Sequence, residues 1–144
     1  MEINGGAELH CRQVAEHMSK YWDIEVLTTC AKDYNTWENE FTEGIDLINN
    51  IPVRRFSVDK KRRMFFFKLY SRLAFREKSS FQQQERWMKL QGPFSSSLLQ
   101  FIEDNRNNYQ YFFFFTYLYC STYFGLRYVG NKAILIPTAH DERP

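Results

Sequence analysis

Glycine, proline and cysteine are all scarce in this chain of 144 residues. It contains 6 glycines and 4 prolines, too few for a collagen-like or low-complexity protein. The 3 cysteines, Cys11, Cys30 and Cys120, are odd in number and lack C-x-x-C spacing, which argues against a disulfide framework or a zinc site. The first residues also lack the apolar run of a signal peptide. We therefore expect a cytoplasmic protein with reduced thiols.

Aromatic side chains, in contrast, are abundant and make up 18% of the residues. The hydrophobic fraction of 44% and the charged fraction of 25% are typical of a folded globular domain. The length suits one domain spanning residues 1–144. So many rings require a core or a ligand surface to cover them.

Charge is unevenly distributed along the chain, although the net charge is only +2. Residues 54–78 hold ten basic and two acidic side chains, a local net charge of +8 against −6 for the remainder. This asymmetry indicates an anionic partner.

Hydrophobic periodicity predicts helices and strands in alternation, and residues 31–50 lack any period and are expected to form a loop. The expected helices are 7–21, 61–78, 81–90, a helix capped within 95–97 that ends near 105, and 119–126. The expected strands are 24–29, 51–58, 111–116 and 133–137. The last two are apolar throughout, as in parallel strands covered on both faces. The alternation predicts an α/β fold with a parallel sheet flanked by helices.

Residues 107–126 carry no formal charge, and twenty such residues are about enough to span a bilayer as a helix. Five of them are tyrosines, and the apolar core is limited to Phe112–Phe115. A strand followed by a helix therefore fits this segment better than a transmembrane helix.

Two glycines, Gly5 and Gly6, stand immediately before the first predicted helix. Because glycine has no Cβ, a ligand can approach the backbone there, and the helix N-terminus offers N–H groups to an anion. This combination suits a diphosphate. The plain alternative is a flexible turn.

The string from Asn4 to Thr29 resembles the opening of a group 1 (family 4) glycosyltransferase, where a Gly-Gly-Ala-Glu turn leads into the first helix of an N-terminal Rossmann-like domain. The resemblance continues through Asp33-Tyr34, Trp37, Val53-Arg54-Arg55-Phe56, Gln91-Gly92-Pro93, 114–119 and 136–142. It covers nearly the whole chain, and its most specific parts are the glycine turn and the terminal His140-Asp141.

The resemblance implies a GT-B enzyme, in which an acceptor-side and a donor-side Rossmann-like domain enclose the active site. A retaining enzyme of this kind moves a sugar from a nucleotide-sugar donor to a hydroxyl of a glycan or lipid-linked acceptor. It needs no cofactor beyond that co-substrate, and no metal. The usual central first strand and the donor domain with its paired glutamates have no counterpart here, so we expect a fragment truncated at both ends and inactive alone.

The resemblance also assigns candidate site residues. His140 matches a position near the transferred sugar and is the catalytic candidate, although a histidine among acids after a strand can equally be an ordinary polar loop. The candidates for donor or substrate binding are Gly5, Gly6, Glu8, Thr116, Tyr117, Tyr119 and Asp141. Tyrosines after a strand can stack on sugars, or can simply belong to the core.

The basic segment 60–78 supports an alternative function, a non-catalytic module that docks on an anionic membrane surface. The membrane-facing candidates are Lys61, Arg62, Arg63, Phe66 and Lys68. A solvated helix that packs its apolar face on the sheet is the simpler explanation. Single-stranded nucleic acid also suits basic residues interleaved with aromatics, but no nucleic-acid module is recognisable and no such partner is expected.

Overall fold

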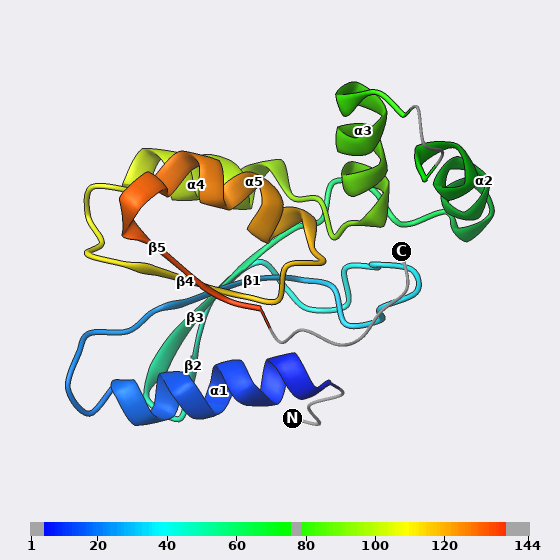
Figure 1. Ribbon diagram of the computed structural model, residues 1–144. Coiled ribbons are helices and arrows are strands. Elements are labelled where there is room, and N and C mark those ends of the chain that lie inside the picture. Colours follow the sequence, from blue (N-terminus) through cyan, green and yellow to red (C-terminus); the bar gives the residue numbers. More distant parts are fainter. Residues whose placement is uncertain (1–4, 76–78, 138–144) are drawn as a thin grey trace.

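The chain adopts an α/β fold in a computed structural model that describes residues 5–75 and 79–137 (Figure 1). The elements within these ranges are α1 (Gly6–Met18), β1 (Val26–Thr29), β2 (Gly44–Ile48), β3 (Ile51–Phe56), α2 (Met64–Ala74), α3 (Phe81–Gln91), α4 (Ser96–Asn105), β4 (Phe112–Phe115), α5 (Cys120–Val129), the 3-10 helix η1 (Gly130–Lys132) and β5 (Ala133–Ile136). Every helix and strand predicted from periodicity is present, and the mixed α/β class is confirmed.

The prediction that residues 31–50 form a loop is wrong in its second half. Gly44–Ile48 is strand β2, which pairs antiparallel with β3 from Gly44 opposite Arg55 to Ile48 opposite Ile51. The turn between them contains Asn49 and Asn50, with φ of 50° and 64°. Asparagine tolerates this left-handed conformation, which a two-residue hairpin of this kind requires. The Asn-Asn pair was the available sequence signal.

The strands form two separate sheets instead of the single parallel sheet that was predicted. One has the order β1-β3-β2, with β1 and β3 parallel from Val26 opposite Val53. The other pairs β4 and β5 in parallel, from Phe112 opposite Ala133. In the described ranges no ladder joins β1 to β4, although both run in the same direction in Figure 1. β1 and β4 are therefore not hydrogen-bonded neighbours, as they would be in one continuous open sheet.

Helices cover the strands on two sides, with α4 and α5 on one face and α1 on the other (Figure 1). The face under α4 and α5 holds the main core, in which Phe56, Leu98, Ile102, Phe112, Phe114 and Val129 are buried together. On α1, Ala15 is the one buried residue. The two helical layers are thus packed very unequally.

The two apolar strands differ in how well they are covered. Phe112 and Phe114 of β4 are buried, whereas Phe113 and Phe115 are half-buried beside Trp22 and His10 respectively. On β5, Ile134 and Leu135 remain 37% and 41% exposed, so the prediction of a strand covered on both faces is wrong there. Within the described part of the chain β5 pairs with β4 alone, which leaves it at a sheet edge. No helix among those described is long and apolar enough to cross a membrane.

The helices α2 and α3 pack on each other and project from the sheets (Figure 1). α2 is shorter than the predicted range 61–78, of which residues 76–78 lie outside the described residues. A capping box between Ser80 and Gln83 begins α3. At the base, the Asp59 N–H donates to the Phe94 carbonyl at 2.9 Å. The segment between Asp59 and Phe94 therefore leaves and rejoins the sheets at one point.

Candidate functional site

The N-terminus of α1 lies at the edge where the parallel strands have their carboxyl ends. The ring of His10, in the second turn of α1, is 5.6 Å from that of Phe115, the last residue of β4. Trp22, beyond the other end of α1, lies 6.5 Å from Phe113 and 6.3 Å from Tyr111. α1 therefore runs antiparallel to β4, which places Gly5 and the first turn of α1 at the carboxyl edge.

Gly5 caps α1 without a side-chain hydrogen bond, in an extended conformation with φ −145° and ψ 155°. The first N–H groups of a helix have no intrahelical partner and face outward from its end. Open space surrounds the position where Gly6 would carry a Cβ, whereas a Cβ on Gly5 would collide with the Glu8 carboxylate. Glu8 thus lies back over the helix terminus, where the dipole favours a negative charge. An anionic ligand that approaches Gly5 would meet the Glu8 carboxylate, which carries the same sign of charge.

The segment after β4 brings three predicted residues to the same edge. Thr116 is buried and has φ 62°, a left-handed conformation that is unusual for a β-branched residue. Its N–H donates to the carbonyl of Ile136, the last residue of β5, at 2.8 Å. Tyr117 is 37% exposed. Burial and the charge of Glu8 raise the pKa of Tyr119, so its hydroxyl stays a proton donor at neutral pH.

Arg62 is not on the exposed basic surface where it was predicted to face a membrane, because it is only 8% exposed. Its guanidinium lies 4.9 Å from the Trp37 ring and 4.8 Å from that of Phe67. The Nε donates to the Gln91 carbonyl at 3.0 Å, and the Nη1 to that of Tyr34 at 3.2 Å. A planar, weakly hydrated guanidinium suits such stacking. Burial lowers the pKa of Arg62.

Trp37 joins this cluster to the predicted site residues. Its ring packs edge-on against Tyr119 at 5.6 Å, and its indole Nε1 donates to the Gln91 carbonyl at 2.7 Å. Gly92 is required beside it, since a Cβ there would lie 2.9 Å from the indole. Sequence reasoning did not assign Trp37 or Arg62 to this site. The available signal was the recurrence of Trp37 and Gln91-Gly92-Pro93 in the family resemblance.

The remaining predicted residues lie apart from this cluster. Lys61, Arg63, Phe66 and Lys68 are exposed on α2 or just before it, and Lys61 forms an ion pair with Glu38. His140 and Asp141 lie outside the described residues.

The cysteines occupy interior positions, as expected of small apolar residues. Cys30 and Cys120 are buried and Cys11 is half-buried, and all three are free thiols. Burial raises the pKa of Cys11 to about 11 and that of Cys120 to about 12. These two thiols therefore stay protonated and are poor nucleophiles at neutral pH.

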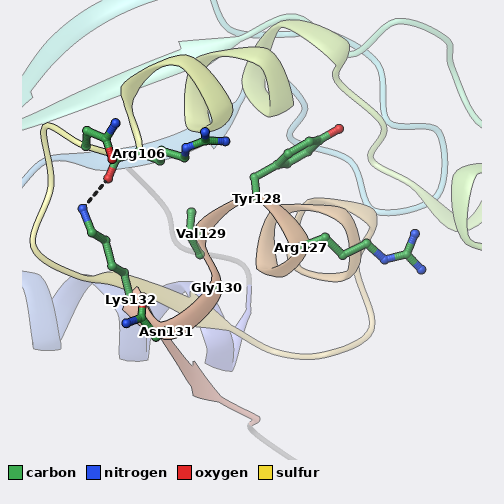
Figure 2. A pocket seen from close by; sticks show the side chains of 8 residues that line it. Arg106, Arg127, Tyr128, Val129, Gly130, Asn131 and Lys132 are labelled. Carbon is green, nitrogen blue, oxygen red and sulfur yellow. Dashed lines mark hydrogen bonds between the residues drawn. The ribbon is translucent and has the colours of Figure 1, made fainter.

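A hollow of about 260 Å³ lies near the opposite end of β5 and is lined by Arg106, Asn107, Arg127, Tyr128, Val129, Gly130, Asn131 and Lys132 (Figure 2). The Lys132 ammonium donates to the carbonyls of Arg106 at 2.8 Å and Tyr109 at 2.9 Å. Arg127 points away from the hollow in Figure 2 and pairs with Glu85. The cations here do not converge on one point, so the carboxyl edge is the stronger candidate.

A scan against protein-family models and searches of curated proteins and of solved structures found no match to the chain. Within residues 5–75 and 79–137, no three His, Cys, Asp or Glu side chains gather into a group that could hold a metal ion.

Proposed function

We propose that this chain is the acceptor-side Rossmann-like domain of a retaining GT-B glycosyltransferase. One observation supports this above the others, namely the Gly5-Gly6 terminus of α1 at the carboxyl edge of the parallel strands. Ligands of open α/β folds bind at that edge. The whole enzyme would move a sugar from a nucleotide-sugar donor to a hydroxyl of a glycan or lipid-linked acceptor.

Each part of the edge has a role in this proposal. The N–H groups of the first turn of α1 and the helix dipole stabilise the negative charge of the leaving diphosphate. The protonated hydroxyl of Tyr119 donates a hydrogen bond, and the exposed ring of Tyr117 offers a sugar an apolar face. His140 contacts the sugar by family resemblance. Donor specificity belongs to the second domain, so the chain alone transfers no sugar.

Binding of inorganic pyrophosphate tests the role of the glycine turn. We expect amide NMR shifts at Gly5, Gly6 and Ala7 on titration of the chain with pyrophosphate. The variants Gly6→Asp and Gly6→Asn form a matched pair, because they have the same shape and differ in charge, and a Cβ at Gly6 meets no atom within 4 Å. The Asp variant should bind about tenfold more weakly than the Asn variant, since it adds a negative charge at the anion site. If the two variants bind pyrophosphate equally well, the Gly5-Gly6 turn does not contact the anion.

The DNA on both sides of the coding segment provides a second, independent test. We expect an apolar strand to be encoded immediately before Met1 and a second α/β domain after Pro144. Stop codons that close the segment at both ends would overturn the proposal.

A further inference from the structure

The basic helix α2 has a row of large apolar side chains that are exposed to solvent. Phe65 is 75% exposed, Phe66 54%, Leu69 52% and Leu73 41%, and these four residues are called the outer stripe below. The rings of Phe65 and Phe66 contact each other edge-on at 5.6 Å. Contiguous apolar surface of this kind on a soluble domain marks a site of interaction.

The outer stripe points away from the remainder of the molecule. α2 packs on α3 through its other side, where Phe67 lies 5.9 Å from Trp87 and the Trp87 indole donates to the Ser71 hydroxyl at 2.8 Å. Ala74, on that same side, is buried. At 100° per residue, the centre of this packed side lies roughly 150° around the helix from the centre of the stripe. The simpler expectation, that α2 lays its apolar face on the sheet, is therefore wrong.

Cations border the outer stripe on both sides. Helical geometry places Lys68 and Arg72 along one side of the stripe and Arg63 along the other, and all three are exposed. Lys60 and Lys61 precede the helix and are exposed as well. The first turn of α2 contains no acidic residue. A partner for this surface must therefore be apolar where the stripe meets it and negatively charged around it.

We propose that α2 binds the interface of an anionic lipid bilayer. The outer stripe enters the boundary between headgroups and acyl chains, and Lys68, Arg72 and Arg63 lie at the level of the lipid phosphates. A bilayer supplies both chemistries at the spacing that an amphipathic helix presents. The α2–α3 pair projects from the sheets in Figure 1, so a flat surface can reach α2 without meeting them. This inference stands without the proposed sugar transfer.

Vesicle binding by the whole chain tests the proposal. We expect co-sedimentation with vesicles that mix phosphatidylcholine and phosphatidylglycerol, and little with phosphatidylcholine alone. The double variant Phe65→Ser/Phe66→Ser should lower the partition coefficient by about tenfold or more, because it removes two rings from the apolar phase. Its control is Ile45→Ser/Leu47→Ser, which changes two exposed apolar residues of β2 and should bind normally.

A set of charge-reversal variants distinguishes electrostatic binding to lipid from nonspecific adsorption. Lys68→Glu/Arg72→Glu should also reduce binding by about tenfold, and binding by the unaltered chain should fall as salt is raised. Lys20→Glu/Arg106→Glu makes the same charge change at exposed positions away from α2 and should have a much smaller effect. Circular dichroism of each variant checks that it is folded.

Three results would overturn the proposal. One is absence of sedimentation with anionic vesicles at low salt, and another is equal loss of binding in the β2 control. The third is self-association of the chain that Phe65→Ser/Phe66→Ser abolishes while vesicle binding stays absent, which would assign the stripe to a second copy of the chain.

Discussion

The helices α2 and α4 have similar lengths and the same apolar spacing, but they differ completely in burial. α4 buries Leu98, Leu99 and Ile102, because it lies against α5 and β1. α2 leaves Phe65 and Leu69 more than half exposed, because within the described residues it packs mainly on α3, through its opposite side. The spacing of apolar residues thus identifies an amphipathic helix in both cases. It does not say whether protein, another molecule or water covers the stripe.

The largest expected contrast comes from truncating one residue of each stripe. Ile102→Ala should lower the free energy of unfolding by about 2–5 kcal/mol, because it opens a cavity in the main core. Leu69→Ala should change it by less than about 0.5 kcal/mol, since the side chain is exposed. Urea unfolding followed by circular dichroism measures both. Similar losses of unfolding free energy in Ile102→Ala and Leu69→Ala would contradict the exposure of the outer stripe on α2.

Arg62 and Arg63 provide a second contrast, between adjacent residues of the basic segment. Arg62→Ala should cost about 2–3 kcal/mol, because it removes charged hydrogen bonds to the Gln91 and Tyr34 carbonyls inside an aromatic cluster. Arg63→Ala should cost little, since its side chain is exposed. Hydrogen exchange should speed up in α2 and α3 in the first variant only. Equal protection in both would contradict the anchoring role of Arg62.

Gly125 of α5 tests how tightly the well-covered face is packed. A Cβ at this position would lie 2.7 Å from Cε1 of Phe114 and 3.5 Å from Cδ1 of Ile102. Gly125→Ala should therefore destabilise the chain by about 1–3 kcal/mol, although alanine is the better helix former. Thermal melting measures the change, and a stabilised variant would mean that Phe114 moves aside freely.

The last prediction is a pH dependence of stability at Tyr109, which precedes β4. Burial and a hydrogen bond donated to Glu25 raise the pKa of Tyr109 from 10.0 to about 12. Because the folded pKa exceeds the unfolded one, this stabilisation is complete below pH 10 and is lost as the pH rises towards 12. The urea midpoint should fall less steeply across that window in Tyr109→Phe. If the urea midpoints of the unaltered chain and of Tyr109→Phe fall equally steeply with pH, the raised pKa of Tyr109 is contradicted.

The sequence predicted local structure well, because local structure depends on periodicity and capping. Ser95 caps α4 as expected, with its side chain accepting from the Leu98 N–H. β2 was missed because it lies within the largely polar segment 31–50, although it is no shorter than β1, β4 or β5. The division into two sheets depends on hydrogen bonds between distant strands, which no local pattern encodes.

The candidate site was predicted in part for the same reason. Gly5 and Gly6 could be placed, since a glycine turn before a helix is a local feature. The contact between Trp37 and Arg62 joins residues 25 positions apart, and that between Trp37 and Tyr119 spans a still longer separation. Arg62 lies among other basic residues, and nothing in the sequence distinguishes it as the one that is buried. That distinction depends on which aromatic rings fold over it.

The hydrogen bond between Asp59 and Phe94 also has an evolutionary consequence. It holds together the two ends of the segment that carries α2 and α3. A gene that lost the codons between them would need only a short turn to rejoin the chain. We therefore expect related genes to vary the length of the α2–α3 helices, while the strands, α4 and the residues that contact Trp37 are maintained. Among relatives, we expect sequence and length to diverge fastest in α2 and α3, but not at Arg62, Gln91 and Gly92, which pack against Trp37.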